Sequence, residues 1–91
     1  MPKRTDSNQA QIIAALREFG ASVQDLSSVG KGCPDLAVGF GGKTFLMEVK
    51  TDKGKLNPRE EKWHSSWRGS VHIIHDILEA IEIITQSDTN D

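Results

Sequence analysis

Two strand-like segments joined by Gly41-Gly42 constrain the fold of this 91-residue chain most strongly. Adjacent glycines between such segments favour a tight β-hairpin, because glycine readily adopts the positive φ angles of two-residue hairpin turns. Counting outward from the turn predicts that Phe40 pairs with Lys43 and that Asp35 lies opposite Glu48. Like charges in opposed positions are destabilising, so this pair of acids would cost stability unless a cation lies between them.

Side-chain alternation along the predicted hairpin separates an apolar face from a charged face. The apolar face carries Leu36, Val38, Phe45, Met47 and Val49, and the other carries Asp35, Ala37, Leu46, Glu48 and Lys50. Carboxylates from two strands suit Mg²⁺, which takes one or two of them and adds water and phosphate oxygens. Lys50 would then stabilise developing negative charge or position an attacking water. Alternatively, Lys50 simply pairs with Glu48, and Asp35 caps a turn.

Start and stop signals elsewhere predict the element order α-β-β-β-α-β-α, an α/β (α+β) domain. Asp6 or Ser7 is expected to cap a first helix that ends before Gly20. A second helix is expected to start at Asn57-Pro58, with Glu60 completing a capping box, and to end at Gly69. The expected strands are 21–26, 35–40, 43–50 and 71–74, and a last helix follows Asp76. The first helix carries an apolar stripe of Ile12, Ile13, Leu16 and Phe19.

Composition indicates one small domain spanning residues 1–91, with a core of about residues 5–85 and a frayed tail at 86–91. The single cysteine, Cys33, is expected to be a small buried thiol, and no apolar stretch is long enough to span a membrane. We therefore expect a cytoplasmic protein. All 11 Lys and Arg precede Asp76, whereas five of the 13 acids lie at or beyond it, which leaves room for a basic face.

Four ordered blocks of the chain resemble the virus-type replication-repair nuclease (VRR-NUC) domain of the PD-(D/E)XK superfamily. They are "NQAQIIAALREFGASV", "VGKGCPDLAVG", "LMEVK" and "LNPREEKWHSSWRGSVHII", and the resemblance covers about residues 5–84. It implies a restriction-endonuclease-like core with a mixed β-sheet flanked by helices. It also implies dependence on Mg²⁺ or Mn²⁺ and hydrolysis of phosphodiester bonds in DNA.

The resemblance also assigns roles to individual residues. Asp35 and Glu48 match the metal-binding acids, the Val49 carbonyl matches a usual additional ligand, and Lys50 matches the motif lysine. The family often has an acid in its first helix where this chain has Gln11, and often glutamine where this chain has Glu60. An amide oxygen still accepts a hydrogen bond from water, so Gln11 is retained among the expected catalytic residues.

Further polar and aromatic residues suggest weaker hypotheses. Basic residues near the proposed site are expected to contact the phosphate backbone of DNA, and they are Lys31, Lys53, Lys55, Arg59 and Lys62. Trp63 and Trp67 lie four residues apart on one helical face, a spacing more typical of a core or a dimer interface than of a base-stacking surface, and we expect them in the core. The three histidines, His64, His72 and His75, lack the spacing of a structural zinc site.

The function expected from these residues is a metal-dependent, structure-selective DNA endonuclease. Stand-alone relatives of this size resemble phage-borne enzymes that act on branched DNA such as four-way (Holliday) junctions, in the host cytoplasm. A homodimer would place two active sites on opposing strands and would add burial to a thin core. The alternative is a non-catalytic nucleic-acid-binding or interaction module on the same fold, in which Gln11 has impaired the chemistry.

Overall fold

The computed structural model describes residues 4–51 and 54–86, which form three helices and four strands in the predicted order. The elements are α1 (Arg4–Phe19), β1 (Ser22–Asp25), β2 (Leu36–Phe40), β3 (Lys43–Val49), α2 (Pro58–Ser66), β4 (Val71–Ile74) and α3 (Ile77–Gln86). Helix α1 begins at Arg4, so the expected cap at Asp6 or Ser7 is wrong. Helix α2 ends at Ser66 rather than at Gly69, because Trp67 leaves the helical conformation.

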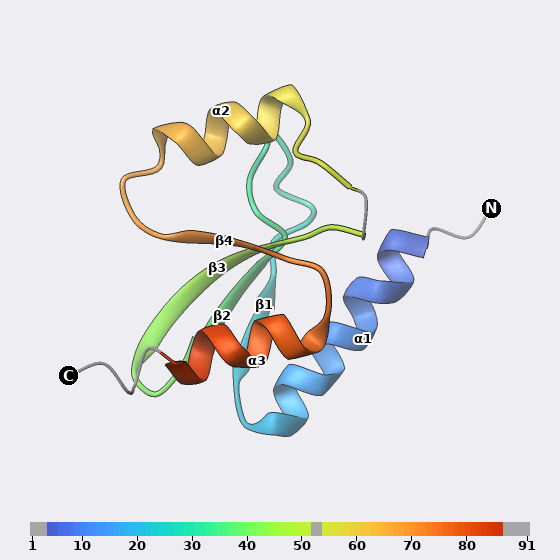
Figure 1. Ribbon diagram of the computed structural model, residues 1–91, viewed down its shortest axis with the longest axis vertical. Helices are drawn as coiled ribbons and strands as arrows, with labels where there is room; N and C mark the ends of the chain where they lie inside the picture. Colours follow the sequence, from blue (N-terminus) through green and yellow to red (C-terminus); the bar gives the residue numbers. More distant parts are fainter. Residues whose placement is uncertain (1–3, 52–53, 87–91) are drawn as a thin grey trace.

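The four strands form one mixed sheet in the order β1-β2-β3-β4 (Figure 1). Strand β2 is antiparallel to both β1 and β3, whereas β4 is parallel to β3. The predicted hairpin register is confirmed, with Phe40 opposite Lys43. The β2–β3 ladder ends at Leu36 and Met47, so the two acids lie just beyond the last pair.

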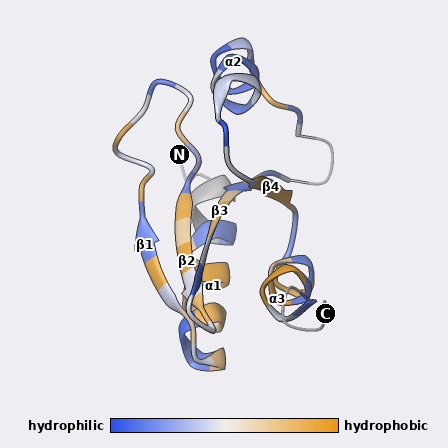
Figure 2. Ribbon diagram, turned by 90° about the vertical axis from the view of Figure 1, so that its left-hand side faces the viewer, coloured by the Kyte–Doolittle hydropathy of each residue, from blue (hydrophilic) through white to orange (hydrophobic). Residues whose placement is uncertain are grey.

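Helices α1 and α3 pack together over one face of the sheet and enclose the core (Figures 1 and 2). The expected apolar face of the hairpin is buried in this core. The core residues are Ile12, Leu16, Ala21, Leu36, Val38, Phe45, Met47, Val49, Ile74, Ala80 and Ile84. Phe19 belongs to the predicted apolar stripe of the first helix, but it remains 45% exposed at the end of α1, where its ring meets that of Phe40.

Helix α2 stands apart from this core, beyond the end of the sheet where β2 begins and β3 ends (Figure 2). Its start was predicted correctly, since Asn57 and Glu60 form a reciprocal capping box and Pro58 occupies the first turn. Every residue of α2 is described, and none of them is buried. The helix is therefore held by its ends and by polar contacts rather than by an apolar face.

No helix in the described ranges is long and apolar enough to cross a membrane.

Candidate active site

Two acids and a lysine meet where the central hairpin ends and α2 begins. Asp35 directly precedes β2, Glu48 is the penultimate residue of β3, and Lys50 directly follows β3. The first turn of α2 adds Glu60 to this group. The chain thus brings three carboxylates and one ammonium together from the hairpin and from a helix start, and we call these four residues the acid cluster.

Backbone hydrogen bonds fix Asp35 at the strand start. Its Oδ2 accepts from the Val49 N–H at 2.9 Å, and its backbone carbonyl accepts from the Leu26 N–H at 2.7 Å. Burial raises the pKa of Asp35 above its usual value, although the Val49 hydrogen bond acts in the opposite direction. This hydrogen bond therefore holds the Asp35 carboxylate at the end of β3, next to Glu48, as the hairpin register predicted.

Glu48 is the most unusual residue of the acid cluster because it is only 2% exposed. Burial, together with repulsion from Asp35 and Glu60, raises its pKa to about 8. Its buried Oε1 has no hydrogen-bond partner among the described residues. A buried carboxylate oxygen without a donor is costly, and such an atom commonly marks a functional group or the position of an ion.

Lys50 contacts two of the three acids. Its Nζ lies 2.8 Å from Oε1 of Glu60 and 3.7 Å from Oε2 of Glu48. Burial alone would lower the pKa of Lys50, but the hydrogen bond and charge of Glu60 and the charge of Glu48 outweigh it, so the pKa is raised. Burial would raise the pKa of Glu60, but hydrogen bonds from Lys50 and the Asn57 N–H lower it below the usual value. The acid cluster thus contains one close ion pair, between Lys50 and Glu60, whereas a negative charge on Glu48 would be only weakly neutralised by the more distant Lys50.

Gln11 is placed differently from these residues. It lies on the exposed side of α1, and the hydrogen bonds and ion pairs that join the acid cluster do not include it. Gln9, two residues earlier, is buried and donates a hydrogen bond to Asp25 at 3.4 Å. A catalytic role for Gln11 stays a prediction, and Glu60, flagged in the sequence only as a departure from the family pattern, is the residue that joins the site.

Three of the expected DNA-contacting residues meet at one cavity of about 360 Å³ beside the acid cluster. Its lining residues are Lys31, Arg59, Lys62, Trp63 and Ser66. Lys55 is exposed and does not line this cavity, and Lys53 lies outside the described residues. The close approach of the Lys31 loop to α2 requires Gly32, because a Cβ there would lie 2.4 Å from the Arg59 carbonyl oxygen.

The two tryptophans are not core residues, so that prediction is wrong. Trp67 is 46% exposed and Trp63 is half-buried, and their rings stack on each other with centroids 4.6 Å apart. The four-residue spacing correctly indicated one helical face, but α2 does not pack that face on the sheet. The sequence signal for the cavity was the spacing of Arg59, Lys62, Trp63 and Ser66, which fall on one side of a helix.

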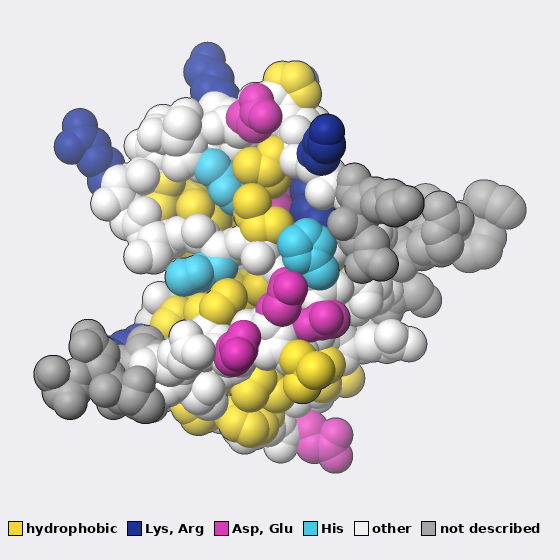
Figure 3. Space-filling view, viewed as in Figure 1, with side chains coloured by type: hydrophobic (Ala, Val, Ile, Leu, Met, Phe, Trp, Pro, Cys, Tyr) yellow, Lys and Arg dark blue, Asp and Glu magenta, His cyan; other side chains and the backbone are white. Residues whose placement is uncertain are grey.

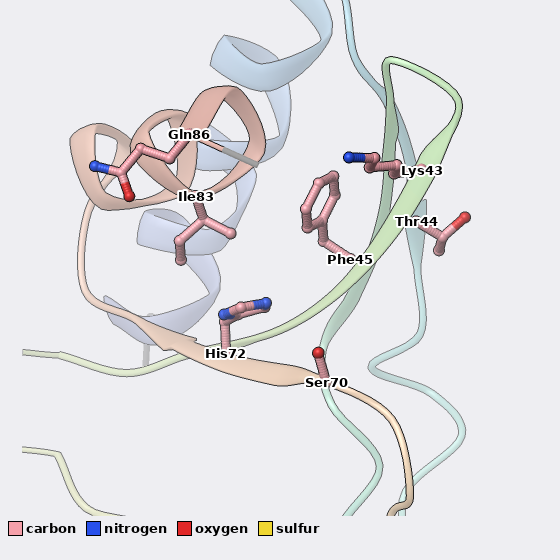
Figure 4. Close-up of a pocket in the computed structure, with 7 residues that line it drawn as sticks. All are labelled: Lys43, Thr44, Phe45, Ser70, His72, Ile83 and Gln86. Carbon is pink, nitrogen blue, oxygen red and sulfur yellow. The ribbon is translucent and has the colours of Figure 1, made fainter. Parts of the chain in front are cut away.

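A larger cavity of about 700 Å³ lies at the opposite end of the sheet, between the hairpin turn, β4 and α3 (Figure 4). Phe45 and Ile83 project into it, and the rings of Phe45 and His72 lie 6.2 Å apart. Burial lowers the pKa of His72. None of the residues that line this cavity within the described part of the chain is acidic.

Comparison with known proteins agrees on the architecture. No protein-family model matches the chain, and no curated protein matches it either. A solved structure described as a "VRR_NUC domain" superposes with a TM-score of 0.72 at 23% sequence identity, covering 92% of this chain and 97% of that one. The mixed sheet with flanking helices that was expected from the sequence is confirmed, and this chain has the fold of a VRR_NUC domain.

Proposed function

We propose that this protein is a metal-dependent, structure-selective endonuclease that hydrolyses phosphodiester bonds in branched DNA such as four-way junctions. The observation that carries the proposal is the state of Glu48, a 2% exposed carboxyl group with one oxygen that finds no hydrogen-bond donor in the part of the chain that the structure describes. It lies beside Asp35 and within 3.7 Å of Lys50. The fold shared with a VRR_NUC domain supports the same chemistry.

The acid cluster fits a hard divalent cation that keeps part of its shell open. Among the described residues, no three His, Cys, Asp or Glu side chains are arranged to hold a metal by themselves. Mg²⁺ and Mn²⁺ need fewer protein ligands than three, because two carboxylates suffice when water and substrate phosphate oxygens complete the octahedral coordination shell. Asp35, Glu48 and the Val49 carbonyl would hold the ion, which would supply Lewis-acid chemistry at the scissile phosphate.

The chain's own residues supply charge and orientation. The Val49 N–H holds Asp35 through Oδ2, so the direction of that carboxylate is fixed by the backbone of β3. Lys50 presents an ammonium whose raised pKa keeps it charged at neutral pH. Such a charge stabilises the negative charge that develops on phosphoryl oxygens in the transition state.

Binding to DNA is proposed through the basic surface beside the acid cluster. Lys and Arg side chains project around α2, whereas acidic side chains gather over β4 and α3 on the face in Figure 3. Phosphate contacts by Lys31, Arg59 and Lys62 would orient the backbone without reading sequence. A homodimer would present two such sites to two strands, as cleavage of a four-way junction requires.

Cleavage assays test this function directly. A four-way junction, a forked duplex and a linear duplex are incubated with the protein in Mg²⁺ or Mn²⁺, with a chelator as control, and light scattering gives the mass in solution. We expect metal-dependent cleavage of the branched substrates and a dimer. Binding without cleavage in either metal would favour the non-catalytic module, whereas a 10.0 kDa species or equal cleavage of the linear duplex would contradict the dimer or the substrate preference.

A further inference from the structure

The cavity beside the acid cluster combines positive charge with an aromatic ring. Arg59, Lys62, Trp63 and Ser66 occupy one side of α2, and Lys31 faces them from the loop before β2. Lys31, Arg59 and Lys62 are exposed, and no acid among the described residues lines the cavity. The cavity thus offers three cations at its rim and an indole in its wall.

Local geometry explains why these groups meet. Lys31 has φ 59° and lies between two glycines with φ of 75° and 86°, so the loop turns sharply at this point. Gly32 brings that turn against the backbone of Arg59 and Glu60, closer than a residue with a Cβ would permit. The loop that carries Lys31 is therefore seated on the first turn of α2, and Glu60 of the same turn contacts Lys50.

Trp63 is held in place by its neighbours. Its ring stacks on Trp67 with an interplanar angle of 17°, and the ring of His64 approaches it edge-on at 71°. Since α2 contributes no buried residue, this aromatic pair adds nothing to the core. The Trp63 indole is thus held in place outside the core and lies beside three cationic side chains. Surfaces that bind single-stranded nucleic acid have this composition, because their cationic side chains contact the phosphates and their aromatic rings stack on the bases.

We infer that this cavity binds one unpaired nucleotide of the DNA strand that enters the acid cluster, with its base against Trp63 and its phosphate between Lys31, Arg59 and Lys62. The inference rests on the proposed nuclease function for its choice of ligand, and it specifies that the preferred substrate has a single-stranded nucleotide next to the cleavage site. A base that is already unpaired avoids the energy of unstacking. The preference for branched DNA then arises partly from this cavity.

Intrinsic fluorescence provides the test, because the chain contains two tryptophans, both in this aromatic pair, and no tyrosine. The full-length protein is titrated in chelator with a single-stranded oligonucleotide, a blunt duplex, and a strand carrying a run of abasic residues. We expect quenching by the first, weak quenching by the duplex, and salt-sensitive binding without quenching for the abasic strand. Since the abasic comparison uses the wild-type protein, it does not depend on how a variant folds.

Variants separate stacking from charge. Trp63→Leu should weaken single-strand affinity by about 5- to 150-fold without changing its salt dependence, and Trp63→Phe should restore most of the loss. Arg59→Ala should reduce the slope of log affinity against log salt by about 0.7. Arg68→Ala removes the same charge from a position outside the cavity and is the matched control, expected to leave quenching unchanged.

Three results would overturn the inference: equal quenching by duplex and single strand, unchanged affinity of Trp63→Leu, or an Arg68→Ala effect as large as that of Arg59→Ala. Failure here is distinguishable from failure of the nuclease proposal. Binding is measured without metal, whereas cleavage is measured separately with metal. If the protein cleaves junctions but binds single strands no more tightly than duplex, the nuclease proposal would stand and the proposed nucleotide site would be wrong.

Discussion

Lys50 and Glu60 form an ion pair of 2.8 Å that joins the end of the central hairpin to the first turn of α2. The same ammonium lies 3.7 Å from Glu48, so it is shared unequally between two acids. Glu48 is left with a raised pKa and with one oxygen that has no hydrogen-bond partner in the described ranges, while the pKa of Glu60 is lowered. The stability and the chemistry of this protein are therefore expected to depend on the same few charges.

Replacing the buried acid should separate activity from folding. We expect Glu48→Gln to abolish cleavage, because it removes an anionic ligand that a hard cation requires. Metal-free stability should hold near neutral pH, where the raised pKa of about 8 keeps Glu48 largely protonated, and it should rise above pH 8, where like-charge repulsion with Asp35 is removed. Single-turnover cleavage and thermal unfolding measure the two effects, and cleavage at the wild-type rate would show that the site is wrongly assigned.

Stability should fall as pH rises through the range that the Glu48 pKa defines. The folded-state pKa of about 8 lies above the ordinary value of 4.5, so between these pH values the folded state binds the extra proton. The protonation of Glu48 therefore contributes to the free energy of unfolding. This contribution is complete below pH 4.5, is lost by about pH 8, and amounts to roughly 3 to 5 kcal/mol at most. Urea unfolding in chelator measures it, and a Glu48→Gln variant with the same pH profile as wild type would contradict it.

Removing the ammonium should slow hydrolysis more than it weakens metal binding. We expect Lys50→Ala to reduce the single-turnover rate about 100- to 1,000-fold, because the charge acts on the transition state rather than on the ion. It should also destabilise the metal-free protein, since Glu48 and Glu60 lose their shared cation. Calorimetry with Mn²⁺ decides the point, and lost affinity with an unchanged cleavage rate would refute it.

Neutralising Glu60 should lower the pKa of Glu48, because one of its negative neighbours disappears. Glutamine can still accept the Asn57 N–H hydrogen bond of the capping box, so the start of α2 should be retained. In Glu60→Gln, the loss of stability with rising pH should therefore begin at lower pH than in wild type. Glu61→Gln carries the same charge change on the exposed side of that helix turn, and an equal shift in this control would exclude a local effect.

Alanine substitutions at two glycines of one loop should separate the cost of backbone strain from the cost of a steric clash. Gly30 and Gly32 both have positive φ, so alanine at either should cost about 1–2 kcal/mol of unfolding free energy. Only at position 32 would the new Cβ collide with the Arg59 carbonyl, which should add about 1–3 kcal/mol. Chemical denaturation of Gly30→Ala and Gly32→Ala measures the difference, and equal losses would mean that the loop does not rest on α2.

Local sequence signals predicted the parts of this fold that depend on local geometry. The hairpin register followed from Gly41-Gly42 and strand alternation, and the start of α2 followed from Asn57, Pro58 and Glu60. These signals work because turn and cap conformations depend on a few neighbouring residues. The same reasoning located Asp35, Glu48 and Lys50 at one end of the hairpin.

Tertiary placement was less accessible from the sequence. The spacing of Trp63 and Trp67 gives a helical face, but it does not tell whether that face meets the sheet, and here it does not. Spacing likewise could not reveal that Gln9 rather than Gln11 turns inward on α1. Both outcomes depend on the rotation and position of a whole helix, which distant contacts determine.

The separation of α2 from the core has an evolutionary consequence. A helix that contributes no buried side chain can accept substitutions, or a change of length, without disturbing the packing of the sheet against α1 and α3. The acids on the hairpin and the exposed side chains of α2 can therefore diversify at different rates. One scaffold of this kind could change the outer surface of a single short helix while the hairpin acids, and Glu60 at the start of that helix, stay the same.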